Sequence, residues 1–95
     1  MKLDWAGRSL ADLNDLEAHI RAHNPTAAAR VFNAIKGTAA RLRRYPRAGP
    51  PGRRSGTREI VARGTPQLIV YRLEANRIII LRVRHGRQRW PVTHP

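Results

Sequence analysis

The chain of 95 residues contains no cysteine. This absence excludes a disulfide framework, a thiolate metal site and a cysteine nucleophile, and it fits a reducing cytoplasm. Long apolar runs are also missing, because the longest run of large aliphatic residues is Ile78–Leu81 and a membrane span needs roughly 18 apolar residues. No signal-peptide pattern precedes the first polar helical segment. We therefore expect a cytoplasmic protein with no membrane partner.

The residues of common catalytic constellations are scarce. Ser9 and Ser55 are the only serines, and neither lies in a nucleophile-elbow pattern. No glycine-rich turn follows a predicted strand to hold a phosphate. These absences argue against acyl transfer and nucleotide hydrolysis.

One cluster has the spacing of metal ligands. Asp15, His19 and His23 follow one another at intervals of four residues, which places them on one helical face. No cysteine or further carboxylate completes the ligand set. The pattern therefore favours a solvated polar face, and we expect no metal and no cofactor.

Acidic residues are few, since six stand against 19 lysines and arginines and the net charge is +13. Residues 1–24 hold three basic and four acidic groups, whereas residues 25–95 hold sixteen basic and two acidic groups. A field of this kind attracts nucleic acid, an anionic membrane or an acidic protein, and charge alone does not choose among them. Seventeen of the basic residues are arginine, whose G/C-rich codons account for part of the excess. We still expect a functional cationic surface.

Two helices are predicted after a short strand over residues 1–5. Apolar residues at helical spacing place the first helix over residues 8–23, with Ser9 and Asp12 as a candidate capping pair. Asn24–Pro25 ends this helix and starts the second, because Asn is a favoured N-cap and Pro wastes no hydrogen bond at the first helical position. The inward stripes are Leu10, Leu13, Leu16 and Ile20 in the first helix, and Ala28, Val31, Ile35, Ala39 and Leu42 in the second.

The second half predicts a small sheet. The second helix ends near Tyr45–Pro46, and a loop rich in Pro, Gly and Arg continues to residue 57. Three β-like runs follow, over residues 58–63, 67–74 and 77–84. In the last run, Ile79, Leu81 and Val83 share the expected core face, and Ile78, Ile80, Arg82 and Arg84 share a face that turns cationic. Two helices cover only one face of a sheet, so the other is left to solvent or to a partner.

Basic residues, a histidine and a tryptophan gather in the strands and the tail. They are Arg58, Glu59, Arg63, Arg82, Arg84, His85, Arg87, Arg89 and Trp90. Guanidinium groups bind phosphate, histidine transfers protons and an aromatic ring stacks on a base. A metal-independent ribonuclease would use such a set. The alternative is structural, with solvated arginines at the sheet ends and Trp90 anchoring the tail.

Five segments carry a resemblance to a known family. Asn24–Ala28, Tyr45–Gly49, Gly56–Glu59, Ile69–Arg72 and Arg82–Pro91, in the order β-α-α-β-β-β, resemble the RelE/ParE superfamily of bacterial type II toxins over essentially the whole chain. The resemblance implies one α+β domain over residues 1–95, with two antiparallel helices packed on one face of a small antiparallel sheet. It also implies a growth-inhibiting toxin that forms a hetero-oligomer with a cognate antitoxin, whose acidic segment wraps the toxin.

The tail separates the two branches of this superfamily. RelE-like members cut messenger RNA in the ribosome, and their tail often reads His-Arg-Arg-x-x-Tyr, whereas ParE-like members block DNA gyrase. Here the matching residues are His85, Gly86, Arg87 and Trp90. Indole has no hydroxyl for acid–base chemistry, and Gly86 lacks a phosphate-binding cation. The resemblance therefore favours a non-enzymatic, ParE-like inhibitor of gyrase with no catalytic residues.

Two alternatives stay open. The first is a ribosome-dependent mRNA endoribonuclease with Glu59, Arg82, His85 and Arg87 at the reacting phosphate. The second is a plain nucleic-acid-binding module, whose affinity would fall steeply with salt.

The expected contact residues divide into two sets. For the target we predict Arg82, Arg84, His85, Arg87, Arg89 and Trp90, the densest cationic and aromatic cluster. For the antitoxin we predict Arg30, Arg41, Arg44 and Arg47, on the second helix and the following loop. Relatives often have Ser-Pro where this chain has Ala6 and Gly7, so we also expect the first helix to lack an N-cap.

Overall fold

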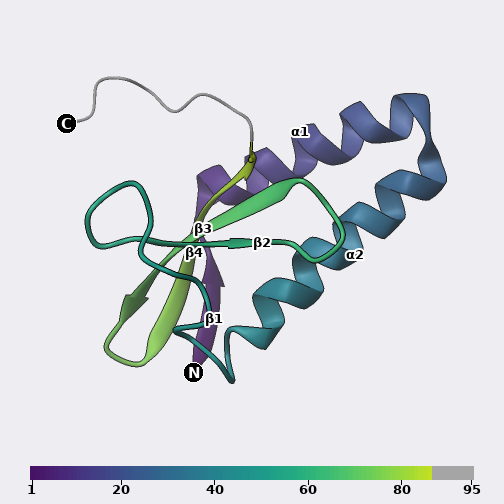
Figure 1. Cartoon of the computed structure of the whole chain (residues 1–95). Helices are drawn as coiled ribbons and strands as arrows, with labels where there is room; N and C mark the ends of the chain where they lie inside the picture. The colour runs from purple at the N-terminus through teal and green to yellow at the C-terminus, as the bar shows by residue number, and fades with distance from the viewer. Residues whose placement is uncertain (87–95) are drawn as a thin grey trace.

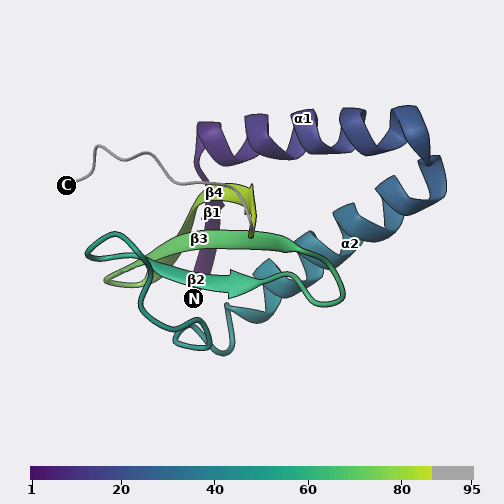
Figure 2. The same cartoon turned by 45° about the horizontal axis from the view of Figure 1, so that its top comes forward.

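The computed structural model describes residues 1–86, so the predictions for Arg87, Arg89 and Trp90 lie outside the described residues. The elements are β1 (Lys2–Trp5), α1 (Gly7–His23), α2 (Pro25–Arg41), β2 (Arg58–Val61), β3 (Gln67–Glu74) and β4 (Arg77–His85). The two helices form a hairpin that extends beyond the sheet (Figure 1). In Figure 2, α1 runs above β4 and α2 returns diagonally behind the sheet. The predicted α+β fold and element order are confirmed.

The sheet has the strand order β1-β4-β3-β2. The β2–β3 and β3–β4 pairs are antiparallel, as expected, whereas β1 pairs with β4 in parallel. A parallel pair needs a long crossover connection, and the helical hairpin lies in the chain between β1 and the other strands. The sheet is therefore mixed, and β1 and β2 are its edge strands.

A one-residue irregularity in β4 changes which side chains face the core. Val70 of β3 pairs with Arg82, but the next residue, Tyr71, pairs with Ile80, so Leu81 is skipped as a β-bulge. A bulge resets the alternation of a strand. As a result, Leu81 and Arg82 both lie outside the buried core and line the same surface hollow.

The predicted core face of the last strand was therefore wrong in two of its three residues. Ile78, Ile80 and Val83 belong to the buried core, whereas Ile79 and Leu81 are only half-buried. Strict alternation places Ile80 and Val83 on opposite faces. The bulge between them brings both to the core.

The start of α2 forms as predicted. The Asn24 side chain accepts a hydrogen bond from the Ala27 N–H at 3.1 Å, and Pro25 occupies the first helical position. The helix ends at Arg41, four residues before the predicted end. A hydrogen bond from the Tyr45 N–H to the Arg41 carbonyl, 3.0 Å long, continues the chain as a turn.

The start of α1 has no side-chain cap, as expected from Ala6 and Gly7. The predicted capping pair of Ser9 and Asp12 was wrong. The Ser9 hydroxyl donates a 2.6 Å hydrogen bond to the Ala6 carbonyl, and Asp12 faces β4 instead.

The core lies between the helical hairpin and the sheet. All five residues of the predicted α2 stripe are buried, and Leu13 of α1 joins them. Leu16 and Ile20 pack against the core, but Leu10 is 47% exposed and does not belong to it. Over residues 1–86, neither helix has the length and apolar character needed to cross a membrane.

The loop between α2 and β2 is fastened to the sheet by one tyrosine. The Tyr71 side chain is fully buried, and its hydroxyl accepts a hydrogen bond from the Gly49 N–H and donates one to the Pro46 carbonyl, at 2.9 and 2.8 Å. A Cβ at Gly49 would lie 2.8 Å from the Glu59 carbonyl oxygen and 2.9 Å from the Tyr71 ring. Only glycine fits this position, so the loop is held closely against β2 and β3.

Replacing this tyrosine tests the loop anchor. Tyr71→Phe leaves the buried Gly49 N–H without its acceptor, so we expect it to lower the free energy of unfolding by about 1–3 kcal/mol. Tyr45→Phe is the matched control, because Tyr45 is 56% exposed, and its effect should stay within about 0.5 kcal/mol. Urea unfolding of both variants measures the difference, and equal stability of the two would contradict the anchor.

Candidate functional site

Ion pairs neutralise part of the cationic surface. Five of the six acidic side chains bind arginine, in the pairs Glu17–Arg21, Glu59–Arg53, Glu74–Arg72, Glu74–Arg77, Asp4–Arg77 and Asp12–Arg82. Further arginines line two surface hollows. One lies on the sheet face opposite the helices, called here the outer face, and the other lies beside the edge strand β2.

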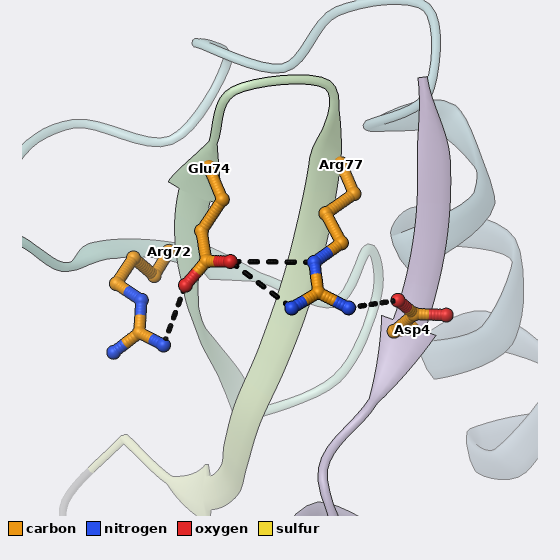
Figure 3. A network of polar contacts seen from close by, with 4 residues as sticks. All are labelled: Asp4, Arg72, Glu74 and Arg77. Atoms are coloured by element: carbon orange, nitrogen blue, oxygen red, sulfur yellow. Dashed lines mark hydrogen bonds and ion pairs between the residues drawn. The ribbon is translucent and has the colours of Figure 1, made fainter.

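The hairpin end of the outer face is neutralised by a network across β1, β4 and β3. Figure 3 shows Arg77 between Glu74 and Asp4, with Arg72 on the far side of Glu74. The Arg77 guanidinium donates to Asp4 at 3.0 Å and to Glu74 at 3.1 Å. Hydrogen bonds from Arg77 and Arg72 hold the pKa of Glu74 below its usual value. Two positive and two negative groups cancel here, so this end offers no net cationic surface.

At the other end of β4, Asp12 of α1 binds Arg82 and Val83 of the strand, beyond the bulge. These contacts are called here the Asp12 clasp. The Asp12 carboxylate accepts hydrogen bonds from the Arg82 Nε and Nη2 at 2.8 and 3.0 Å, and from the Val83 N–H at 2.9 Å. β1 pairs with β4 only as far as Ile80, so Asp12 supplies an acceptor where β1 no longer does. Arg82 is thus tied into the fold.

Burial alone would raise the pKa of Asp12, but it is outweighed. The hydrogen bonds from Arg82 and Val83, with the charges of Arg82 and Arg84, hold the pKa of Asp12 below its usual value. The same carboxylate raises the pKa of Arg82. Both groups are therefore charged at neutral pH, and the clasp is a charge-assisted contact between α1 and β4.

A hollow of about 350 Å³ adjoins this clasp and is called here the outer-face pocket. Its walls include Arg8 of α1, Arg54 of the loop, and Arg82 and Arg84 of β4, and Val70 and Leu81 contribute apolar surface. Burial and the charges of Arg82, Arg8 and Arg53 lower the pKa of Arg84, against the opposing effect of Asp12. Burial is the main cause of the lowered pKa of Arg84, and the neighbouring arginines add to it.

Glu59 lies under the loop at the border of this pocket. Its carboxylate accepts a hydrogen bond from the Arg53 N–H at 2.9 Å and pairs with the Arg53 side chain at 3.7 Å. Only 13% of the Glu59 side chain is exposed. Glu59, Val70 and Arg82 lie opposite one another on three neighbouring strands. Glu59 therefore holds the loop over part of the outer face. From the sequence, this face was expected to be covered only by solvent or by a partner.

A second hollow of about 700 Å³ lies between the end of α2 and β2 and is called here the α2–β2 groove. Leu42, Tyr45, Ile60 and Val61 give it an apolar lining, and Arg41 and Arg63 add positive charge. Val61 is 55% exposed, and β2 is an edge strand. The groove thus combines apolar surface, cations and a strand edge.

The predicted antitoxin contacts fall mostly near this groove. Arg41 lines it, and Arg44 and Arg47 line an adjoining hollow of about 380 Å³ together with Tyr45. Arg30 is exposed further towards the start of α2. These positions place three of the four arginines around one tyrosine.

The predicted target contacts are only partly gathered. Arg82 and Arg84 line the outer-face pocket, and His85 is exposed at the end of β4. Arg8 and Arg54 were missed, because they are distant from β4 in the sequence and no local pattern distinguishes them from other arginines. The α2–β2 groove was not predicted from the sequence either. One signal was present, because Val61 lies three residues before the turn at Gly64 and therefore near the end of a strand.

The histidine cluster does not form a metal site in the described part of the chain. The rings of His19 and His23 lie 5.4 Å apart, and the His23 Nδ1 lies 3.1 Å from the His19 carbonyl. No group of three or more potential ligands occurs among residues 1–86.

Known proteins share this architecture and sequence. The family described as "ParE toxin of type II toxin-antitoxin system, parDE" matches residues 3–90. A Sinorhizobium fredii protein named "Putative toxin Y4kP" is 39% identical over 90 residues, covering 95% of this chain and 93% of that protein.

Two solved structures agree with these matches. A chain of the chromosomal ParDE system of P. aeruginosa matches with a TM-score of 0.81 and 25% identity, over 90% of this chain and 95% of that one. A chain of the toxin–antitoxin complex RelBE2 of Mycobacterium tuberculosis matches with a TM-score of 0.66 and 30% identity, over 88% and 95%.

Fold and sequence together define a toxin of a type II toxin–antitoxin system within the RelE/ParE superfamily. Within that superfamily, the chain belongs to the ParE toxin family.

The Asp12 clasp should make the free energy of unfolding depend on pH. The pKa of Asp12 is lower in the folded chain than in the unfolded chain, so its stabilisation is complete above the unfolded value of about 3.9 and is lost as the pH falls through the folded value. We expect Asp12→Asn to lower the free energy of unfolding by about 1.5–3 kcal/mol at pH 7, as for a hydrogen bond to a charged group. The deficit should shrink as the pH falls below the unfolded value of about 3.9.

Asp15→Asn is the control for this change, because it removes the same charge from an exposed position of the same helix. Denaturant unfolding across the pH range compares the two variants. A constant deficit for Asp12→Asn at every pH would contradict the assigned role of its charge.

Proposed function

We propose that this toxin acts as a non-enzymatic inhibitor of DNA gyrase and that a cognate acidic antitoxin neutralises it. The similarity to the ParE family supports this reading, since ParE-like members of the superfamily block gyrase. Arg84 of the predicted target set borders a cationic pocket, beside the clasped Arg82. The predicted contacts of Arg87, Arg89 and Trp90 remain part of the proposal.

The observation that carries the choice of gyrase over mRNA cleavage is the engagement of Glu59 and Arg82. A general acid or base must reach the proton it transfers, but Glu59 binds the loop at Arg53. An arginine that stabilises a reacting phosphate needs its guanidinium donors, but Arg82 gives Nε and Nη2 to Asp12. Two of the four residues of the candidate ribonuclease set are thus committed to the fold. The mRNA endoribonuclease remains the alternative that the experiment must exclude.

The α2–β2 groove supports the assignment of the antitoxin site. An acidic amphipathic segment can place apolar side chains on Leu42, Tyr45 and Val61, and carboxylates beside Arg41 and Arg63. The loop already pairs with the first part of the β2 edge, where the Glu59 N–H binds the Pro50 carbonyl, so a partner strand can add only at the Val61 end. Arg44 and Arg47 extend the cationic surface, and exposed Arg30 meets a segment that continues along α2. The two solved structures described above come from a toxin–antitoxin system and a toxin–antitoxin complex, which also supports an antitoxin partner.

Two assays with the purified full-length toxin separate the candidate functions. We expect inhibition of DNA supercoiling by gyrase, and no new message ends when the toxin is added to translating ribosomes. Addition of the antitoxin should restore supercoiling. Codon-specific cleavage of messages together with normal supercoiling would reject gyrase as the target and establish the ribonuclease.

A charge placed in the groove tests the antitoxin site. Val61→Asp puts a carboxylate on exposed apolar surface that is proposed to meet an acidic segment, so we expect at least about a tenfold loss of antitoxin affinity, about 1.4 kcal/mol. Val61→Thr keeps the branched shape without charge, and its affinity should change by less than about threefold. Titration calorimetry measures both. Unchanged affinity of Val61→Asp would place the antitoxin elsewhere.

A further inference from the structure

The outer edge of β1 offers backbone groups to a further strand. The Lys2 and Ala6 N–H groups donate to carbonyls on the β4 side, at 3.3 and 2.9 Å. Backbone groups alternate in direction along a strand, so the N–H and C=O groups of Leu3 and Trp5 point to the opposite side. Among residues 1–86, no strand lies on that side. These groups can therefore bond to a strand of another molecule.

The two faces of β1 differ in chemistry. Leu3 and Trp5 pack against the core on the helix side, and Met1, which shares their alternation, is 42% exposed. Lys2 and Asp4 lie on the outer face, on the side of the network in Figure 3. A strand that fits this edge must therefore offer apolar side chains on one face and complementary charges on the other.

The row of alternating charges in Figure 3 ends at this edge. It runs from Arg72 through Glu74 and Arg77 to Asp4, whose side chain is 42% exposed. The next strand would continue the alternation with a cation opposite Asp4. Lys2 is exposed, and the residue opposite it on β4 is Arg77, a like charge. Within the part of the chain that the structure describes, no ion pair joins Lys2 to a carboxylate.

A second copy of β1 satisfies both faces in one antiparallel register. When Leu3 lies opposite Leu3 of the second copy, their outward N–H and C=O groups meet as a hydrogen-bonded pair. Lys2 of each copy then lies opposite Asp4 of the other, which gives two opposite-charge pairs on the outer face. On the helix side, Met1 of each copy lies opposite Trp5 of the other, a favourable contact of sulfur with an aromatic ring.

The neighbouring registers are unfavourable. Moving the second copy by one residue sets Leu3 opposite a residue whose backbone groups already bond to β4. Moving it by two residues sets either Lys2 opposite Lys2 or Asp4 opposite Asp4, and like charges directly opposite each other destabilise a sheet. The side chains of β1 therefore select the register centred on Leu3.

The overall charge opposes association, but β1 lies in the least cationic part of the chain. Residues 1–24 hold three basic and four acidic groups, although the whole chain has a net charge of +13. A strand of four residues also buries much less surface than the roughly 1,600 Å² of a typical stable interface. The dimer should therefore be weak, with a dissociation constant between about 10 μM and 1 mM, and salt that screens the repulsion should strengthen it.

We propose that two copies of the toxin associate through antiparallel pairing of their β1 edges, which joins the two four-stranded sheets into one. The partner is a second copy of this chain, and the register is fixed by the pairs of Lys2 with Asp4. The inference goes beyond the proposed function, because it involves neither gyrase nor the antitoxin. Failure of gyrase inhibition would leave it unaffected.

Sedimentation equilibrium of the full-length toxin without antitoxin tests the dimer, at concentrations up to about 1 mM and in roughly 0.3 M salt, which screens long-range repulsion. We expect Lys2→Glu to raise the dissociation constant by roughly tenfold or more, because two carboxylates then face each other at both ends of the pairing. Arg30→Glu is the matched control, since it makes the same charge change at an exposed position of α2. It should change the dissociation constant by less than about threefold.

A mixing experiment tests the register. Asp4→Lys should also lose self-association, because two lysines then face each other across the edge. In a mixed dimer of Lys2→Glu with Asp4→Lys, both pairs again have opposite charges. We therefore expect the equimolar mixture to associate within about threefold of the unaltered toxin.

Each outcome decides the matter. Selective loss in Lys2→Glu and recovery in the mixture support the inference. A monomer at every concentration would overturn it, and so would a dimer that Lys2→Glu leaves unchanged or that Arg30→Glu weakens equally. A mixture of folded variants that stays monomeric would also overturn it. Asp4→Lys removes the ion pair with Arg77; if it fails to fold, the comparison of Lys2→Glu with Arg30→Glu still decides.

Discussion

The β-bulge at Leu81 and the Asp12 clasp beside it determine how this small domain presents its charge. Without the bulge, the alternation that buries Ile78 and Ile80 would turn Arg82 and Arg84 towards the core, where unpaired charges are costly. The extra residue turns both arginines outward and still buries Val83. Asp12 then accepts hydrogen bonds from Arg82 and the Val83 N–H, which fastens α1 to the end of β4 that β1 does not reach. One irregular residue thus yields both a closed core and a cationic face.

The loop between α2 and β2 connects the two surfaces of the toxin. Its first part contributes Tyr45 to the α2–β2 groove, and its later part contributes Arg54 to the outer-face pocket. Between these parts, Gly49 is fixed under Tyr71. The groove is lined mainly by apolar side chains with Arg41 and Arg63, whereas four arginines line the pocket. One loop thus contributes to two hollows of different chemistry, one beside the edge strand β2 and one on the outer face.

The sequence was sufficient for the features that depend on local patterns. Asn24–Pro25 marked the start of α2, the stripe from Ala28 to Leu42 marked its buried face, and the missing cap at Ala6 was visible directly. The features that it did not reveal depend on long-range partners. Asp12 read as a capping residue because its true partners lie about 70 positions away, and strict alternation cannot reveal a bulge that the pairing of β3 and β4 creates. Arg8 and Arg54 become neighbours of Arg84 only when α1 and the loop meet β4 in the folded chain.

We propose that the antitoxin binds beside the edge strand β2 and that the target binds the outer face, so that the two partners use separate surfaces. Hydrogen–deuterium exchange of the full-length toxin, alone and with its cognate antitoxin, tests this claim most directly. We expect slower exchange at the end of α2 and along β2 in the complex, with little change at Arg54 and at the end of β4. Protection confined to Arg54, Arg82 and Arg84, with an unchanged β2, would contradict the separation of the two surfaces.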